Sequence, residues 1–356
     1  MDYDELLCKL AATKGVSDIH FKVGRPPLVR INGDLLPVDA PALQTCETEQ
    51  IAKHVMSEDL WERFRKHPEI DTSYSLKNVS RFRVNAFRQR GSVSLVLRTI
   101  PYRVPTFEDL GVPEVIRQIC TSQRGLVIVT GITGSGKTST LAAMIDNINE
   151  RFPSHIITIE DPIEFLHKDK RGSINQREVG LDTDDFSSAF VSALRQDPDV
   201  IVVGELRDLK TMTTAIRAAE TGHLVLSTLH TSDAKETINR FVDSFPAHQQ
   251  KQIRIQLAHN LNAVISQRLI SRADRNGRAL ACEVMVVNAA IKEYIMDPEK
   301  ISEIVANMAK GKEKYGSQTF DQAILDLVRK GVISENEALA NATSPNDLKL
   351  KIMQGM

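Results

Sequence analysis

The sequence predicts an α/β fold in which a parallel sheet is buried between helices and preceded by a smaller α+β module. Two observations carry this prediction. Beyond residue 113, apolar runs alternate with segments of helical spacing, as in LVIVT (126–130), which leads into a glycine-rich loop. Strands that are apolar throughout are typical of parallel sheets covered on both faces. The first hundred residues show short β-rich runs separated by turn residues, so we expect a separate module there.

The composition is that of an ordinary globular protein and argues against several classes. Hydrophobic residues make up 42% and charged residues 26% of the chain, and the formal net charge is -1, which argues against a strongly basic nucleic-acid binder. The cysteines at 8, 46, 120 and 282 form no CxxC pair. We therefore expect reduced thiols, not a disulfide framework or a zinc knuckle.

The sequence gives no indication of direct membrane insertion. No stretch approaches about 18 consecutive apolar residues, and the amino-terminal MDYDELLCKL lacks the basic-then-apolar pattern of a signal peptide. We expect a cytoplasmic protein that could still work at a membrane surface through partners.

The amino-terminal module is predicted to span residues 1–98. Helical spacing recurs over 2–13 and 47–66, and alternation over 81–100 predicts two strands that turn at Gly91. Three shorter β-rich runs complete the module: DIHFKVG, PLVRING with a turn at Asn32–Gly33, and DLLPV.

A linker is predicted over 99–113, because TIPYRVPTFEDLGVP carries three prolines and has no sustained period. The second domain then spans 114–356. Its predicted strands and helices cover 126–130, 137–150, 156–160, 185–195, 199–205, 208–220 and 223–229. The last sixty residues are predicted to be helical, with capping-box spacing at Thr319–Gln322 and Ser334–Glu337.

The stretch GITGSGKTST, residues 131–140, matches the phosphate-loop pattern G-x-x-x-x-G-K-[ST] between a predicted strand and a predicted helix. The alternative is a chance match in a glycine turn. The glycines let backbone N–H groups face a polyphosphate; Lys137 is expected to reach its β- and γ-phosphates and the Thr138 hydroxyl to ligate Mg²⁺. The loop residues expected to bind the nucleotide are Gly131, Thr133, Gly134, Ser135, Gly136, Lys137, Thr138 and Ser139.

Two predicted strands end in acidic residues. DVIVVGELRD ends in Gly204–Glu205, with glycine where a common Walker B strand has aspartate, so Glu205 is the candidate for orienting or deprotonating the attacking water. IITIEDPIEF ends in Glu160 and Asp161, with Glu164 three residues on, and one or more of these acids could reach the metal through water. The alternative is that acids at strand ends cap the next helix or face solvent.

Histidines begin and end one apolar strand, in TGHLVLSTLHT. His230 follows the carboxyl end, where open α/β sheets bind ligands, so it could sense the γ-phosphate or touch the catalytic carboxylate. His223 begins the strand and points away by the same rule. Zinc binding by the pair is not expected, because no third ligand has suitable spacing.

Arginines are concentrated in RFRVNAFRQR and at Arg98. Strand spacing places Arg81 and Arg83 on one face. Either this is a solvated strand face, or an arginine reaches a nucleotide from outside the loop domain.

Four segments now stand in order: GITGSGKT, IITIEDPIEF, DPDVIVVGELRD and TGHLVLSTLHT. Together they resemble the Walker A, Asp box, atypical Walker B and His box of the secretion ATPase superfamily. The resemblance is closest to its PilT/PilU branch, the type IV pilus retraction motors. RFRVNAF, AIRAAETGHL and the tail YGSQTFDQAILDLVRKGVISENEALANA also look like that branch, so the resemblance runs almost end to end.

The resemblance implies a RecA-like ATPase domain joined to a smaller PAS-like amino-terminal domain. It implies a homo-hexameric ring that holds ATP and Mg²⁺ between the two domains, beside a neighbouring subunit. Glu205 would be the catalytic glutamate, and the family's arginines match Arg83 and Arg98, with Arg81 as a further candidate. Domain rotation would act on an inner-membrane pilus platform protein, which places the ring at the inner face of the inner membrane.

Two differences from related motors bear on which branch of the superfamily this chain resembles. The four-cysteine insertion and the longer amino terminus of extension and type II secretion motors are absent, which favours the retraction branch. Retraction motors resemble one another at AIRNLIRE, where this chain has AIKEYIMD (290–297), and the ending SPNDLKLKI looks more like PilU-type paralogues. The chain is therefore either a retraction motor or an accessory motor that assists a paralogous retraction ATPase.

Other classes fit less well. A DNA-translocating or helicase-like relative conflicts with the near-neutral charge and the lack of a basic-aromatic groove. A small-molecule kinase would need an arginine-bearing lid and an acceptor site, which the sequence does not indicate. A ring subunit that binds nucleotide and partners with little work of its own remains a structural alternative.

Overall fold

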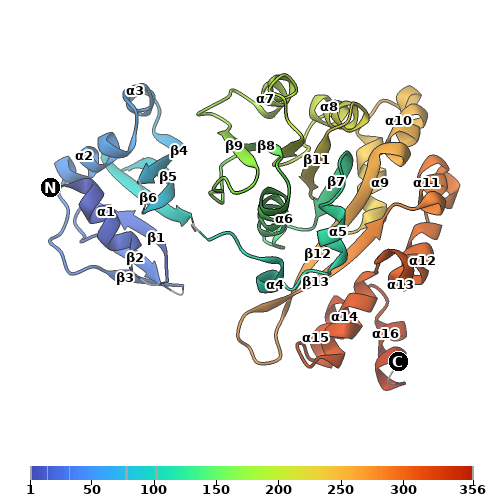
Figure 1. Ribbon diagram of the computed structural model, residues 1–356. Coiled ribbons are helices and arrows are strands. Elements are labelled where there is room, and N and C mark those ends of the chain that lie inside the picture. Colours follow the sequence, from blue (N-terminus) through green and yellow to red (C-terminus); the bar gives the residue numbers. More distant parts are fainter. Residues whose placement is uncertain (1, 14, 32, 77–78, 101–102, 355–356) are drawn as a thin grey trace. The chain divides into compact units, whose positions relative to one another are not determined.

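The computed structural model describes residues 2–354 except 14, 32, 77–78 and 101–102, and Figure 1 traces their helices and strands. The chain divides into two compact units: unit 1 is Met1–Arg103 with Pro162–Leu166, and unit 2 is Val104–Asp161 with His167–Met356. The predicted turn at Asn32 and positions 101–102 of the predicted linker lie outside the described residues. The boundaries 1–98, 99–113 and 114–356 stay predictions.

Unit 1 contains a six-stranded antiparallel sheet of order β3-β2-β1-β6-β5-β4. Its elements are α1 (Tyr3–Ala11), β1 (Val16–Phe21), β2 (Leu28–Ile31), β3 (Asp34–Pro37), α2 (Thr45–Val55), α3 (Glu58–Lys66), β4 (Glu69–Leu76), β5 (Ser80–Gln89) and β6 (Ser92–Ile100). Alternate residues of β5 such as Phe82 and Val84 are buried in one core with Ile51 and Phe64 of the helices. This alternation was predicted, and Gly91 makes the turn with φ of 79°.

The single helix predicted over 47–66 is instead two helices. Ser57 has an extended backbone, and its hydroxyl accepts the Leu60 N–H at 3.4 Å, which caps the start of α3. A serine with this geometry begins a new helix, since its side chain satisfies one of the free amides of the first turn.

Unit 2 contains a seven-stranded sheet of order β13-β12-β7-β11-β10-β8-β9, in which only the β12–β13 pair is antiparallel. Its strands are β7 (Gly125–Thr130), β8 (His155–Glu160), β9 (Ser173–Glu178), β10 (Val200–Val203), β11 (Leu224–Leu229), β12 (Leu261–Ser271) and β13 (Arg278–Val286). The four predicted strands correspond to β7, β8, β10 and β11. The predicted α/β fold class is confirmed, whereas β9, β12 and β13 were not predicted.

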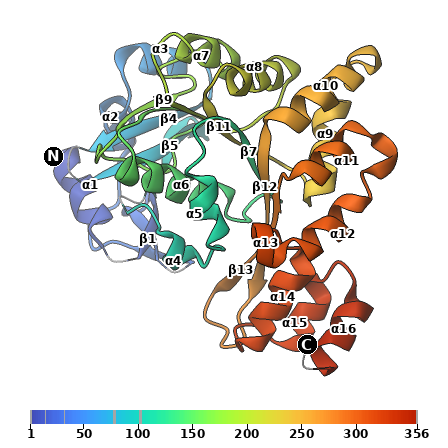
Figure 2. The same ribbon diagram turned by 45° about the vertical axis from the view of Figure 1, so that its right-hand side comes forward.

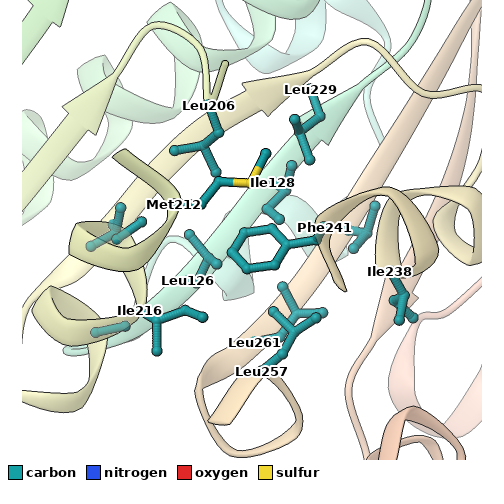
Figure 3. Packing of buried hydrophobic residues seen from close by; sticks show 14 of the residues in the cluster. Leu126, Ile128, Leu206, Met212, Ile216, Leu229, Ile238, Phe241, Leu257 and Leu261 are labelled. Carbon is teal, nitrogen blue, oxygen red and sulfur yellow. The ribbon is translucent and has the colours of Figure 1, made fainter. Parts of the chain in front are cut away.

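Helices cover both faces of the unit 2 sheet. The helices α4 to α6 share one core with the inward residues of β7, and α7 to α12 share the other. Figure 3 shows the Phe241 ring beside Leu126 and Ile128 of β7. The helices are α4 (Phe107–Leu110), α5 (Val115–Ile119), α6 (Lys137–Arg151), α7 (Phe186–Ala193), α8 (Leu209–Glu220), α9 (Ala234–Asp243), α10 (Ala247–Asn260), α11 (Ala289–Met296) and α12 (Glu303–Lys310).

The last helices cover the far half of the β12–β13 hairpin (Figure 2). They are α13 (Lys312–Tyr315), α14 (Phe320–Arg329), α15 (Glu335–Asn341) and α16 (Pro345–Met353), and α14 to α16 share a small core with Ile270 and Ala281. The predicted capping box at Thr319–Gln322 is present. At Ser334 the hydroxyl accepts the Glu337 N–H at 3.3 Å.

All four cysteines are free thiols. Among the described residues no helix combines the length and the apolar character that crossing a bilayer requires.

Candidate nucleotide site

The carboxyl ends of four parallel strands meet at one edge of the unit 2 sheet. There β7 leads into the glycine loop, β8 ends at Glu160, β10 leads to Glu205 and β11 to His230. In the strand order β7-β11-β10-β8, neighbours lie ~4.8 Å apart, so the loop and Glu205 are separated by two strand spacings of this size. Open α/β sheets bind their ligands at this edge.

The loop between β7 and α6 needs its glycines. Gly131, Gly134 and Gly136 have φ of 141°, 78° and 96°, values that side chains disfavour. A Cβ on Gly131 would also lie 2.5 Å from Ser135 Oγ and 2.7 Å from the Gln267 carbonyl oxygen. The loop can therefore curl at the start of α6, where free amides and the positive end of the helix dipole favour an anion.

Lys137, the first residue of α6, folds back over this loop. Its ammonium donates to the carbonyl oxygens of Gly131 at 2.8 Å and Ile132 at 3.1 Å, and the side chain is buried. Thr138 and Ser139 follow in the first turn and are half-buried, whereas Thr133 is exposed. Lys137 is thus hydrogen-bonded across the start of the loop.

One residue beside the loop was missed by sequence reasoning. Gln267 of β12 is buried, and its Nε2 donates to Thr140 Oγ1 of α6 at 2.6 Å. Its Oε1 and the Ser135 hydroxyl are buried without a hydrogen bond among the described residues. The available signal was an amide within the otherwise apolar run LNAVISQRLIS, but its partner strand was not predictable.

Glu205 lies between two basic side chains. Its Oε2 accepts from Arg207 Nε at 2.7 Å, and its Oε1 lies 3.5 Å from His230 Nε2. The hydrogen bond to Glu205, followed by the negative charges of Glu205 and Asp161, raises the pKa of Arg207. The side chain of Glu205 is 20% exposed, so a water at this carboxylate can be both reached and oriented.

Gly204 precedes Glu205 where an aspartate is common, and the packing explains the glycine. A Cβ at this position would lie 3.3 Å from the Ile159 carbonyl oxygen and 3.5 Å from the Phe186 ring. The Gly204 backbone is also fixed on both sides, since its N–H donates to Ile159 O at 2.8 Å and its carbonyl accepts from Thr228 Oγ1 at 2.6 Å. The backbone that leads into Glu205 is therefore held between β8 and β11.

The acids that follow β8 lie in different surroundings. Glu160 accepts from Thr158 Oγ1 at 2.6 Å and from Gln176 Nε2 at 3.0 Å, so part of its hydrogen-bonding capacity is used inside the unit. Asp161 is exposed. Glu164 is exposed in the segment Pro162–Leu166, which groups with unit 1. Roles for these three acids stay predictions.

The two histidines of the β11 segment differ as the strand direction predicts. His230 is exposed beside Glu205 at the carboxyl end. His223 Nδ1 lies 3.0 Å from the Ala218 carbonyl oxygen and 3.2 Å from Thr221 Oγ1 at the other end. His223 therefore closes a turn between α8 and β11.

In unit 1 the candidate arginines share one face of the β5–β6 pair. The register places Arg83 opposite Arg98. Arg81 donates to the Ser73 and Ser75 hydroxyls, and Arg98 Nε lies 3.0 Å from Asp18 Oδ1. Arg83 is exposed, and within the described part of the chain no hydrogen bond or ion pair engages its side chain.

The donor set suits a magnesium ion held mainly by a nucleotide. Within the described residues no group of three or more His, Cys, Asp or Glu side chains could hold a metal. Mg²⁺ at nucleotide sites needs no such group, because phosphates and waters supply most of its ligands. The Thr138 hydroxyl at the start of α6 fits the remaining protein ligand.

The sequence matches the family described as "Type II/IV secretion system protein" over residues 5–340. This chain belongs to that family, and the predicted membership of the secretion ATPase superfamily is confirmed.

Relatives of known name match nearly the whole chain. The type IV pilus retraction ATPase PilT of Pseudomonas aeruginosa is 44% identical over 347 residues, which cover 98% of this chain and 100% of that protein. The type IV pilus ATPase PilU of the same organism is 41% identical over 355 residues, covering 100% and 92%. A crystal structure of the pilus retraction motor PilT with bound ADP has a TM-score of 0.90 at 44% identity, covering 98% and 99%. The prediction of an ATPase is confirmed at the level of the family.

Proposed function

We propose that this chain is an ATP-hydrolysing motor subunit that drives type IV pilus retraction and twitching motility. The single observation that carries this proposal is the edge of the unit 2 sheet, where the phosphate loop, Glu205 and His230 are brought together. The full-length similarity to retraction ATPases supports the biological process.

In this proposal the chain binds ATP mainly through its loop. Backbone amides of Gly131, Gly134 and Gly136 face the phosphates, and the Lys137 ammonium neutralises charge on the transferred phosphoryl group. Bound Mg²⁺ would supply further charge neutralisation from its place beside Thr138. The remaining predicted loop contacts are Thr133, Ser135 and Ser139, with Glu160 and Asp161 near the metal side.

Glu205 is the proposed catalytic base. Its carboxylate orients a water for attack and accepts the proton; the Arg207 guanidinium hydrogen-bonds Oε2, and Oε1 faces the His230 ring at 3.5 Å. His230 is proposed to report the presence of the γ-phosphate to this carboxylate, and its 3.5 Å approach to Glu205 supports that role. Glu164 is proposed as a further acid near the water.

The site is proposed to be completed by a neighbouring subunit in a homo-hexamer. Arg83 is the first candidate for this contact because its guanidinium is exposed and uncommitted in the described part of the chain. Arg98 and Arg81 are secondary candidates, since each already binds a neighbour within unit 1. Hydrolysis then depends on assembly, which couples adjacent subunits.

The proposed partner is an inner-membrane platform protein of the pilus, which the ring would turn from the cytoplasmic face. ATP-driven rotation of the two proposed domains, PAS-like and RecA-like, across the proline-containing segment 99–113 would transmit the force. No direct membrane insertion and no nucleic-acid partner are part of this proposal.

A second candidate is an accessory ring that assists a paralogous retraction ATPase. One observation favours it: within AIKEYIMD, Lys292 and Met296 replace the arginines of AIRNLIRE, and Met296 is exposed on α11. An altered outer surface changes which proteins the ring contacts without changing its nucleotide chemistry. A type II secretion-type or DNA-translocating ATPase is a more remote candidate.

The test is ATP turnover as a function of protein concentration, with molar mass from light scattering, for wild type and Glu205→Gln. If ATP turnover per chain increases as a species of about six chains forms, and is lost in the variant, the result supports a ring motor. Full activity in a monomer would contradict the shared site. A hexamer without turnover would favour the accessory ring, and pilus retraction that persists with Glu205→Gln would exclude the motor role.

A further inference from the structure

Two polar groups beside the phosphate loop are buried without a hydrogen-bond partner among the described residues. They are the hydroxyl of Ser135 and the side-chain oxygen of Gln267, and both residues are at most 2% exposed. Buried polar groups in folded proteins nearly always have a partner, so each exception needs a physical explanation. The hydroxyl can donate a hydrogen bond, whereas the amide oxygen can only accept one. The two groups are therefore complementary.

The orientation of the Gln267 side chain is fixed by its nitrogen. Nε2 donates to Thr140 Oγ1 at 2.6 Å and lies 4.0 Å from Cys282 Sγ of β13. The oxygen of the same amide lies beside the loop, since a Cβ on Gly136 would be 4.0 Å from it. An acceptor is thus held next to the residue that follows Ser135.

The strand that carries Gln267 gives it a rigid support. The preceding residue, Ser266, pairs with Thr130 of β7 and with Glu283 of β13. The Thr130 hydroxyl donates to Ser266 Oγ at 2.9 Å in the buried sheet. Glu283 is also buried, and its Oε1 accepts the Ala234 N–H of α9 at 2.9 Å. Gln267 is therefore a fixed point next to a loop that has to accommodate a ligand.

Ser135 lies against the first residue of this loop. A Cβ on Gly131 would be 2.5 Å from Ser135 Oγ and 2.7 Å from the Gln267 carbonyl oxygen, so the three residues approach one another closely. The Ser135 N–H donates to the Ile132 carbonyl oxygen at 3.1 Å. That carbonyl also accepts from the Lys137 ammonium at 3.1 Å. Ser135 and Lys137 thus share one acceptor within the loop.

The binding of phosphates changes this arrangement. In the proposed function the Lys137 ammonium moves to the phosphates, which removes its hydrogen bonds to the Gly131 and Ile132 carbonyl oxygens. Both of these residues contact Ser135, so the surroundings of its hydroxyl change when the ligand binds. The hydroxyl can then turn about one side-chain torsion to another staggered position.

We propose that Gln267 is a positioning residue for the phosphate loop, whose Oε1 accepts the Ser135 hydroxyl when phosphates occupy the loop. This hydrogen bond forms only in the nucleotide-bound chain and stabilises the loop shape that binds phosphates. The Ser135 hydroxyl supports the loop from the interior of the protein and does not touch the ligand. The inference rests on the proposed nucleotide binding.

The experiment compares double variants of the full chain by isothermal titration of ADP. The loss of ADP affinity caused by Ser135→Ala is measured in wild type, Gln267→Met and Gln267→Glu. Methionine is similar in length to glutamine but has no oxygen acceptor, whereas glutamate keeps one. Ser271→Ala is the matched control, since it changes an exposed serine at the end of the same strand. Circular dichroism and urea denaturation of the nucleotide-free proteins are measured in parallel.

Four results are expected. Ser135→Ala weakens ADP binding by about tenfold in wild type, since it removes one hydrogen bond of the bound state. In Gln267→Met the same substitution costs less than about twofold, because the acceptor is already absent. In Gln267→Glu it again costs about tenfold or more, whereas Ser271→Ala costs less than about twofold in every background. In the nucleotide-free chain Ser135→Ala shifts the urea midpoint equally in wild type and Gln267→Met, because the two groups are not paired there.

Equal losses of ADP affinity from Ser135→Ala in wild type and Gln267→Met would overturn the proposal, because the hydroxyl would then act independently of Gln267. Unequal shifts of the urea midpoint would also overturn it, since the pair would exist before the nucleotide binds. If Gln267→Met does not fold, Gln267→Asn, which is shorter by one methylene, gives the same comparison with the same expectation. If wild type binds neither ADP nor ATP, the proposed nucleotide function fails, and this inference fails with it.

Discussion

His230 Nε2 lies 3.5 Å from Glu205 Oε1, and the two residues follow adjacent parallel strands, β11 and β10. The carboxylate is therefore shared between an imidazole and the Arg207 guanidinium, which lies 2.7 Å from the other oxygen. The hydrogen bond from Arg207 favours one orientation of the acid, with Oε1 toward the His230 ring, and the proposed activation of a water requires such an orientation.

Replacing His230 should lower turnover without preventing nucleotide binding. His230→Ala leaves Oε1 of Glu205 without its ring partner, so we expect kcat to fall by about 10- to 100-fold with ADP affinity nearly unchanged. Steady-state turnover and fluorescent-nucleotide titration measure the two quantities. His223→Ala is the matched control at the other end of the strand; a loss of kcat as large in this control would show that the effect comes from β11 stability.

Arg83 and Glu205 should complement each other between subunits. Arg83→Ala and Glu205→Gln are each expected to be inactive in pure rings. In randomly mixed rings about a quarter of the sites would combine an intact Glu205 with an intact neighbouring Arg83, so turnover should return to about that fraction of wild type. The measurement is turnover after the two variants are mixed and reassembled. Mixtures that stay inactive while forming rings would contradict a contact from a neighbour.

Gly131 should be the loop glycine least tolerant of a side chain. Gly131→Ala forces a Cβ to within 2.5 Å of Ser135 Oγ and 2.7 Å of the Gln267 carbonyl oxygen, at a φ of 141°. We expect ADP affinity to fall by more than about tenfold, because the loop must change shape. Gly180→Ala is the control, since its φ is also positive, at 86°, but a Cβ there meets nothing within 4 Å. Isothermal titration of ADP compares them, and equal losses in both variants would refute the steric argument.

Gln267 and Thr140 should be energetically coupled. Gln267→Leu leaves the buried Thr140 hydroxyl without its 2.6 Å hydrogen bond, which should cost about 1–3 kcal/mol of unfolding free energy. Thr140→Val in the same chain removes the group left without a partner, so the double variant should recover about 0.5–1.5 kcal/mol relative to additive losses. Because Trp61 is the only tryptophan and lies in unit 1, circular dichroism and not fluorescence should follow the denaturation. Strict additivity would show that the two side chains do not interact.

Local sequence patterns were sufficient to predict many residues of the candidate site, but not the surrounding residues that pack against them. The phosphate loop, Glu205 and His230 were predictable because each follows a strand whose apolar run is visible in the sequence, and parallel strands bring such ends together. Gly204 was visible too, but the reason for it, the approach of Ile159 and Phe186, depends on packing.

The hairpin of β12 and β13 was not predicted, for a physical reason. LNAVISQRLIS is buried on both faces, so it lacks the alternation of a half-buried strand, and it directly follows the helix α10. Its pairing with β7 joins Leu126 to Leu261, a contact between distant parts of the chain that no local pattern reports. Gln267 and Glu283 depend on that pairing, so their roles could not be predicted.

Glu283 should make stability fall as pH rises. Burial is the largest cause and raises the pKa of Glu283 to about 7, and the negative charge of Asp233 raises it further. The Ala234 amide, the Arg268 charge and the Phe320 amide act in the opposite direction, because they favour the charged form. An acid whose pKa is higher when folded than when unfolded binds more protons in the folded state. Its contribution to the unfolding free energy is therefore complete below about pH 4.5 and is lost as pH rises to about 7.

The corresponding measurement compares urea denaturation of wild type and Glu283→Gln between pH 4.5 and 8. Because the variant cannot ionise at this position, wild type should lose about 3 kcal/mol more than the variant across this range, from a pKa difference of about 2.5 units between 4.5 and about 7. Other titrating groups are common to both proteins and cancel in the difference. A difference that stays constant from pH 4.5 to 8 would show that Glu283 does not titrate in this range.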